Sequence, residues 1–139
     1  MRRVVVTGLG IVSPLADGVD LTWEKLIASK SGIKEITQFD VSDLPAKIAG
    51  MVPRGDTDVR GKGLFNPDLY VSPKEQRKMD NFILYAIAAA DQAIADSGWV
   101  PQTDHDREVT GVMIGAGIGG LFRTSTIRRS PRFAAIFWI

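Results

Sequence analysis

The 139-residue chain contains no cysteine and a single histidine, His105. The absence of cysteine excludes disulfides, thiolate metal sites and a cysteine nucleophile within this chain. One histidine cannot build a histidine-rich metal site, and His105 stands in a polar stretch where we expect it to be solvated. Because a nucleophile-elbow sequence is also missing, the chain holds no self-sufficient active site. We expect no bound metal and no cofactor.

Long apolar runs are missing as well. No run approaches the roughly 20 apolar residues needed to cross a bilayer, and Thr7, Gly8 and Gly10 interrupt the N-terminal run too early for a secretory segment. The 17 basic and 16 acidic residues nearly balance, so charge gives no general case for nucleic acid or an anionic membrane as a partner. We therefore expect a cytoplasmic protein.

What the chain does contain is an alternation of strand and helix patterns. Residues 4–6 are a continuous β-branched run typical of a buried parallel strand. Residues 109–114 are predicted as a further strand, and residues 47–52 are a short strand candidate. Helices are predicted over residues 21–29, capped by Asp20, and over residues 81–97, ended by Gly98. The second is apolar on every face, which predicts a central helix between layers. This alternation indicates an α/β fold with a largely parallel sheet.

Between these elements, residues 33–46 look irregular and residues 53–71, rich in glycine, aspartate and proline, predict a surface excursion. Ser72-Pro-Lys-Glu75 then forms a typical helix start, with a capping serine and a proline at the first helical position. Lys74, Arg77 and Lys78 follow at a spacing that places them on one helix face. Such a face can bind an acidic partner, although spacing alone favours a solvated surface.

Gly115-Ala-Gly-Ile-Gly-Gly120 has the G-x-G-x-x-G spacing directly after a predicted strand, as in dinucleotide-binding folds. That fingerprint also calls for an acidic residue about 20 positions later, and nothing after Glu108 is acidic. Dinucleotide binding is therefore a remote alternative. A tight turn beside a packed interior is the preferred use of these glycines.

Residues 122–139 do not continue the pattern of residues 1–121. They contain four arginines and no acidic residue, and they end in an apolar, β-prone stretch that is an aggregation liability. We interpret them as an unrelated arginine-rich, apolar-ended tail. A shift of reading frame near codon 121 is our hypothesis for its origin, and a deliberate or natural truncation is the alternative.

Several motifs, in order, resemble one family. They are Arg2-Arg-Val-Val-Val-Thr-Gly-Leu-Gly-Ile-Val-Ser-Pro-Leu15, Thr22-Trp23, Ser31-Gly-Ile33, Lys74-Glu-Gln-Arg-Lys-Met-Asp80 and Gly115-Ala-Gly-Ile-Gly-Gly-Leu121. Together they closely resemble the N-terminal part of the β-ketoacyl-[acyl-carrier-protein] synthase II family over residues 2–121. The resemblance implies the N-terminal half of a thiolase-like αβαβα fold, incomplete here, in a family that usually forms homodimers.

The resemblance also implies an activity. Members of this family elongate fatty acids: an acyl group moves onto a cysteine, malonyl-carrier protein loses CO₂, and the resulting carbanion attacks the thioester. The cysteine and the two histidines of that reaction lie beyond residue 121 in the family, so none is carried over. By resemblance the chain is part of an acyltransferase, and we expect it to be inactive by itself.

Two features are carried over. Lys74, Arg77 and Lys78 match the basic helix face that the family presents to the acidic acyl carrier protein, which reverses the preference for a merely solvated surface. Ile118 matches a residue that lines the fatty-acyl pocket. Two alternatives stay open: a non-catalytic module that binds acyl carrier protein, and a module that pairs with an intact synthase.

Overall fold

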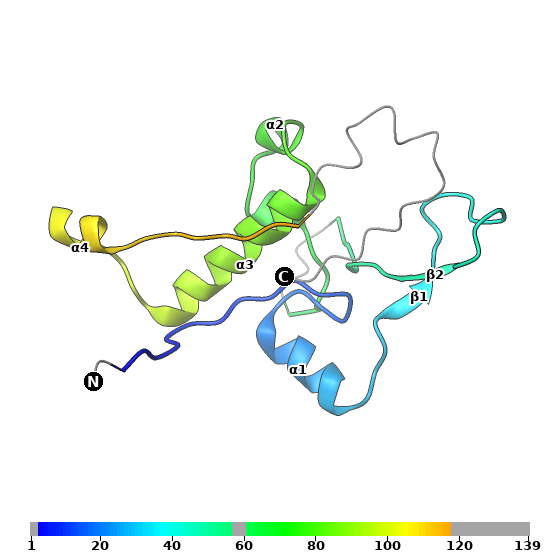
Figure 1. Ribbon diagram of the computed structural model, residues 1–139, viewed down its shortest axis with the longest axis horizontal. Coiled ribbons are helices and arrows are strands. Elements are labelled where there is room, and N and C mark those ends of the chain that lie inside the picture. The colour runs from blue at the N-terminus through cyan, green and yellow to red at the C-terminus, as the bar shows by residue number, and fades with distance from the viewer. Residues whose placement is uncertain (1–2, 57–60, 118–139) are drawn as a thin grey trace.

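The computed structural model describes residues 3–56 and 61–117, and their elements surround one long helix (Figure 1). The helices and strands follow in a simple order along the chain. They are α1 (Val19–Ile27), β1 (Ile33–Glu35), β2 (Ile48–Gly50), the 3₁₀ helix η1 (Pro67–Leu69), α2 (Pro73–Gln76), α3 (Asn81–Ser97) and α4 (Asp104–Val109). No helix in these two ranges is long and apolar enough to span a membrane.

Helix α3 is the centre of the packed region, and its predicted bounds are confirmed. It ends because Gly98 adopts the left-handed conformation, with φ of 63°, which costs glycine little. Leu84 and Ala88 on α3 form the core cluster with Phe65, which is fully buried. The expectation that α3 is covered on every face is wrong for the described residues, since Ile94 remains 56% exposed.

Phe65 also overturns the prediction that residues 53–71 form a surface excursion. Its side chain is fully buried, and its ring packs edge-on against Tyr85 of α3 with 5.0 Å between the centroids. A second ring, that of Tyr70, is stacked on it at 6.1 Å. The polar composition of the segment concealed this aromatic contact, because a few buried side chains hardly change the average hydropathy.

The N-terminal loop runs along α3 at very short range. A Cβ atom on Gly8 or Gly10 would collide with the carbonyl oxygens of Ala93 and Ala89. The loop amides are paired with α3 side chains: Leu9 N donates to Asp96 Oδ2 at 2.8 Å, and Ile11 N donates to Gln92 Oε1 at 3.0 Å. Glycine is required here for close approach of two backbones.

The predicted parallel sheet is not formed by the described residues. Residues 4–6 and 109–114 are not strands, and Val4 and Met113 are 97% and 98% exposed. Neither segment pairs with a neighbouring strand in the described part of the chain. The sheet that is present pairs β1 with β2 in antiparallel register, Ile33 opposite Gly50. β2 lies within the predicted residues 47–52, whereas β1 falls in the segment expected to be irregular.

Helix α1 begins at Val19 after Gly18, so Asp20 lies in its first turn and is not its cap. Thr22 is the buried residue of α1. Three large apolar side chains of α1, those of Trp23, Leu26 and Ile27, are mostly exposed, with 60% of Trp23 accessible.

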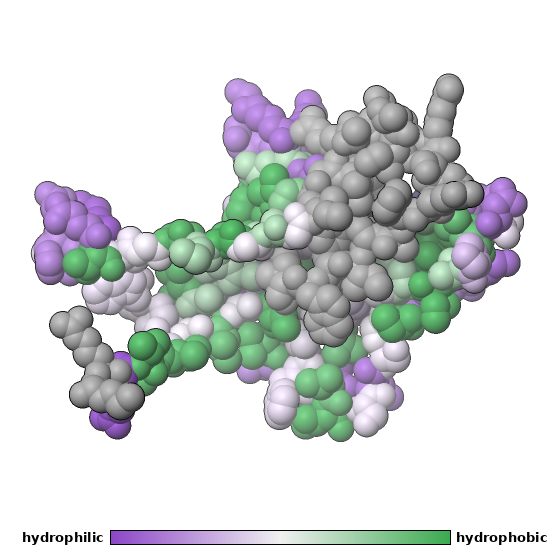
Figure 2. Space-filling view, in the orientation of Figure 1, coloured by the Kyte–Doolittle hydropathy of each residue, from purple (hydrophilic) through white to green (hydrophobic). Residues whose placement is uncertain are grey.

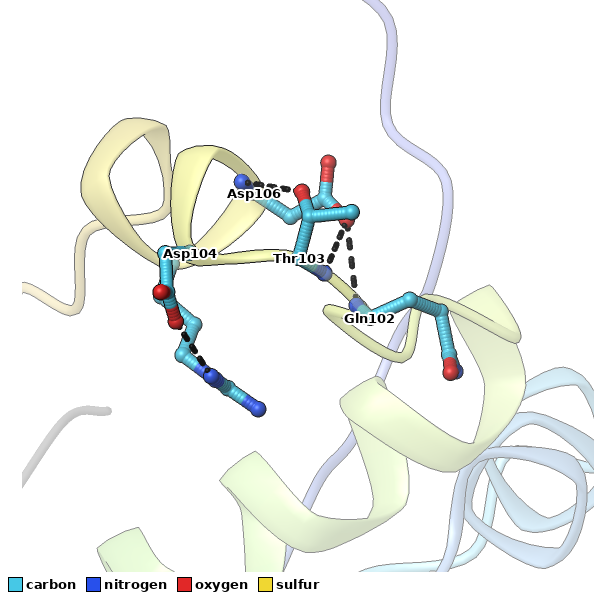
Figure 3. A network of polar contacts seen from close by, with 5 residues as sticks. Gln102, Thr103, Asp104 and Asp106 are labelled. Atoms are coloured by element: carbon cyan, nitrogen blue, oxygen red, sulfur yellow. Dashed lines mark hydrogen bonds and ion pairs between the residues drawn. The ribbon is translucent and has the colours of Figure 1, made fainter.

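Helix α4 occupies the stretch expected to be a polar linker. Thr103 caps it: its hydroxyl accepts from Asp106 N at 3.1 Å, while Asp106 Oδ2 accepts from the Thr103 and Gln102 amides (Figure 3). Arg107 is paired with Asp104 at 2.8 Å. His105 is exposed on this short helix, as expected of a solvated histidine.

Candidate functional site

The basic residues singled out in the sequence lie on α2 and the turn that follows it. As predicted, Ser72 caps α2 by accepting from Glu75 N, and Pro73 is the first helical residue. Lys78 N donates to the Glu75 carbonyl at 2.9 Å, so the helical turn continues past Gln76. Lys74, Arg77 and Lys78 are all exposed, and hydrophilic side chains gather over α2 (Figure 2).

The inner side of α2 is held by Gln76. Its Nε2 donates to Asp68 Oδ1 and to the Val71 carbonyl, both at 2.7 Å. Asp68 belongs to η1, so these bonds tie α2 to the preceding turn. The half-buried amide of Gln76 therefore faces inward, while the cations of the same turn remain accessible to solvent.

One of the three cations has an intramolecular partner. Lys78 Nζ lies 3.1 Å from Glu75 Oε1, and both side chains are well exposed. Exposed ion pairs of this kind contribute only about 0–1 kcal/mol, so Lys78 can exchange Glu75 for another carboxylate at small cost. Lys74 and Arg77 form no ion pair with any other residue of the described ranges. The surface is therefore available to an acidic partner.

Arg54 lies beside the start of α3, and sequence reasoning did not find it. Its Nη2 donates to Asn81 Oδ1 at 2.7 Å and reaches Tyr85 Oη at 3.4 Å. Its guanidinium carbon is 5.7 Å from the centre of the Phe65 ring and 5.8 Å from that of Tyr85, which is within cation–π range. Arg54 lies 27 positions before Asn81 and 31 before Tyr85, so no local sequence pattern indicates these contacts.

A second polar cluster joins the N-terminal loop, α3 and Tyr70. Gln92 Nε2 donates to Asp17 Oδ1 at 2.6 Å, and Tyr70 Oη donates to Asp17 Oδ2 at 3.3 Å. Burial raises the pKa of Asp17, while the hydrogen bonds from Gln92 and Tyr70 act in the opposite direction. These three residues line a small open depression with Leu64 and Leu69. Gln92 interrupts the apolar α3 sequence, but this local signal does not indicate Asp17 or Tyr70 as its partners.

The remaining predicted features find little or no support as sites. Ile118 lies outside the described residues, as do residues 122–139. A Cβ atom at Gly115 or Gly117 would meet no other atom within 4 Å, so the expected tight packing around these glycines is not observed. The strand that a dinucleotide fingerprint requires before them is also not formed. Within residues 3–56 and 61–117, no cluster of histidine, aspartate and glutamate could hold a metal ion.

Comparison with known proteins identifies the protein family to which the chain belongs. The sequence profile of the family described as "Beta-ketoacyl synthase, N-terminal domain" matches residues 1–134. A solved structure titled "The ishigamide ketosynthase/chain length factor" matches with a TM-score of 0.58 and 32% identity, covering 76% of this chain and 23% of that one. The chain belongs to the β-ketoacyl synthase family, and the matched structure supports a thiolase-like fold.

Two curated relatives show which members of this family the chain resembles. The chain is 54% identical over 121 residues to "3-oxoacyl-[acyl-carrier-protein] synthase 2" of Rhizobium meliloti, an alignment that covers 87% of this chain and 28% of the relative. It is 41% identical over 143 aligned positions to the protein of the same name from Vibrio cholerae, covering 99% of this chain and 32% of the relative. The chain thus spans about a third or less of these relatives.

Proposed function

We propose that this chain is part of a 3-oxoacyl-[acyl-carrier-protein] synthase and supplies part of the surface that binds acyl carrier protein. The single observation that carries the proposal is the α2 surface. Three cations are accessible there, while Gln76 holds the inner side of the helix to η1. In a chain so similar to enzymes named for acyl carrier protein, an acidic carrier protein is the partner that fits this charge.

The reaction of the whole enzyme is also part of the proposal. An acyl group is transferred from its carrier thiol to a cysteine thiolate, malonyl-carrier protein loses CO₂, and the carbanion attacks the acyl-cysteine thioester, which forms the 3-oxoacyl product and releases the cysteine thiolate. Transfer to cysteine requires a residue that this chain lacks. We therefore propose that these 139 residues bind the carrier protein and do not carry out the bond-forming step.

We further infer that the described residues correspond to part of the N-terminal half of a thiolase-like αβαβα fold. Two observations support this inference. Residues 4–6 and 112–114 carry large apolar side chains that are exposed. Neither segment has a strand partner among the described residues. Helix α3 likewise carries apolar side chains on a surface that the described residues leave open. Such surfaces are typical of elements that a larger fold covers.

Charge reversal tests the carrier-protein surface. We expect acyl carrier protein to bind the 139-residue chain saturably, with an affinity that falls as salt rises, because exposed charges are screened. Lys74→Glu, Arg77→Glu and Lys78→Glu together should abolish measurable binding in calorimetric titrations. Lys34→Glu, at an exposed position of β1, is the control and should bind like the wild type. Equal binding by the triple variant and the wild type would refute the proposal.

A further inference from the structure

Arg54 is fixed in place from both its backbone and its side chain. Its backbone forms a parallel bridge with Phe65, flanked by bonds from Phe65 N to the Pro53 carbonyl at 2.7 Å and from Gly55 N to the Phe65 carbonyl at 3.2 Å. Its guanidinium then extends to Asn81 and over the Phe65 and Tyr85 rings. Because Phe65 is fully buried, this anchor belongs to the core.

The other end of the contact is the first turn of α3. Asn81 is the first residue of α3, and Tyr85 follows it by four positions, so both lie on the same helix face. The capping residue Asp80 makes no side-chain hydrogen bond to the helix. The bond from Arg54 to Asn81 is thus a long-range side-chain contact that holds the beginning of α3 against the core.

That beginning is joined directly to the basic surface. Arg77 and Lys78 precede Asn81 by four and three residues. Between Lys78 and α3, Met79 packs against the cluster of Phe65, Leu84 and Ala88. Asn81 is therefore separated from the turn that carries two of the three cations by Met79 and Asp80 alone.

We propose that Arg54 is a positioning residue for the carrier-protein surface: through Asn81 it sets the orientation of the turn that presents Arg77 and Lys78. This inference rests on the proposed function. Arg54 acts through its planar guanidinium, which bonds Asn81 while lying near two rings, and not by contacting the carrier protein. Lysine cannot reproduce that combination, because its ammonium is a single point charge on a flexible stem.

The test compares carrier-protein affinity among variants of the 139-residue chain. Arg54→Met removes the charge, Arg54→Lys keeps it, and Asn81→Ala removes the acceptor while leaving Arg54 unchanged. We expect each to weaken binding about fivefold, the effect of one ordinary hydrogen bond. The double variant Arg54→Met/Asn81→Ala should be no weaker than the single variants, because both remove the same contact. Lys34→Met, with the same loss of charge, should leave affinity unchanged.

Three results would overturn the inference. These are wild-type affinity in both Arg54→Lys and Asn81→Ala, full additivity in the double variant, and a shallower salt dependence in Arg54→Met but not in Arg54→Lys. The last would show that the Arg54 charge contacts the partner directly. If Arg54→Met does not fold by circular dichroism, Arg54→Lys and Asn81→Ala still decide. Failure of the proposed function is distinguishable, because the triple charge reversal would then leave binding intact.

Discussion

Gln92 Nε2 lies 2.6 Å from Asp17 Oδ1, and this hydrogen bond joins residues 75 positions apart. It connects α3 to the end of the N-terminal loop, just before α1. Gln92 also accepts from Ile11 N at 3.0 Å through its other amide atom. One side chain on α3 thus organises both ends of the segment from Ile11 to Asp17.

The pKa of Asp17 makes this contact sensitive to pH. Because burial raises that pKa above its ordinary value of 3.8, the folded state binds the proton more tightly than the unfolded state does. The contribution of Asp17 to stability therefore decreases as pH rises through the interval between the unfolded and folded pKa values. We predict that the free energy of unfolding of Asp17→Asn, relative to that of the wild type, is higher at about pH 7 than at about pH 3.5. Urea unfolding at both pH values measures the difference, and a pH-independent difference would contradict the prediction.

The contact between Gly10 and α3 predicts a steric effect. Gly10→Ala places a Cβ against the Ala89 carbonyl oxygen, and forced backbone shifts of this kind cost about 1–3 kcal/mol. Gly111→Ala is the matched control, because a Cβ atom there would meet no atom beyond its chain neighbours within 4 Å. Urea unfolding should show a lower midpoint for Gly10→Ala alone. Equal midpoints for the two variants would mean that the loop does not pack on α3 as described.

Burial distinguishes two large apolar residues that the sequence treats alike. Leu84 is 5% exposed and Trp23 is 60% exposed. Leu84→Ala should lower the free energy of unfolding by about 2–5 kcal/mol, because it leaves a cavity beside Phe65. Trp23→Ala should change it by about 0.5 kcal/mol or less, as surface substitutions do. Chemical denaturation measures both, and a larger loss for Trp23→Ala would show that the α1 face is covered.

The capping box of α4 predicts a local effect at the other end of the molecule. Thr103→Ala removes the hydroxyl that accepts from Asp106 N, at a cost of about 1 kcal/mol to the helix. Amide hydrogen exchange should then accelerate within Asp104–Val109 and not in α3. Thr7→Ala, at an exposed position outside the helices, is the control. Unchanged exchange in α4 would contradict the assigned cap.

Acid should weaken the same cap. Bonds from the Thr103 backbone and side chain, and from Gln102, hold the pKa of Asp106 below its ordinary value. Its stabilising contribution is therefore complete above the unfolded value of 3.8 and is lost as pH falls through the folded pKa. Hydrogen exchange in α4 that shows no dependence on pH beyond the intrinsic chemistry would argue against this linkage.

Two features determined by neighbouring residues were predicted correctly, whereas features determined by distant contacts were not. Local signals also failed twice, because the capping box of α4 was missed and Asp20 is not the cap of α1. The start of α2 at Ser72 and the end of α3 at Gly98 depend on local capping, and both predictions are confirmed. Strands depend on partners elsewhere in the chain, which explains why residues 4–6 and 109–114 were assigned wrongly for the described part. β1, a strand of three residues, was missed because it has no local apolar pattern of its own.

The residues of the candidate site also differ in how far the sequence could predict them. The cations at residues 74, 77 and 78 could be found from helical spacing, and the structure shows them accessible to solvent. Arg54 could not, because its role depends on contacts with Asn81, Tyr85 and Phe65 across distant segments. Asp17 was missed for the same reason. Helical spacing thus located the cations and the family resemblance favoured them as a carrier-protein surface, whereas the contacts of Arg54 and Asp17 depend on the three-dimensional arrangement of the chain.

The most direct measurement maps acyl carrier protein onto the ¹⁵N-labelled chain by NMR. The account predicts that the largest amide shifts fall at residues 72–80, with none at the exposed α1 face around Trp23, and that they disappear in the triple charge-reversal variant. Shifts centred on α1 or on residues 4–6, with α2 unaffected, would contradict the central claim that α2 is the carrier-protein surface.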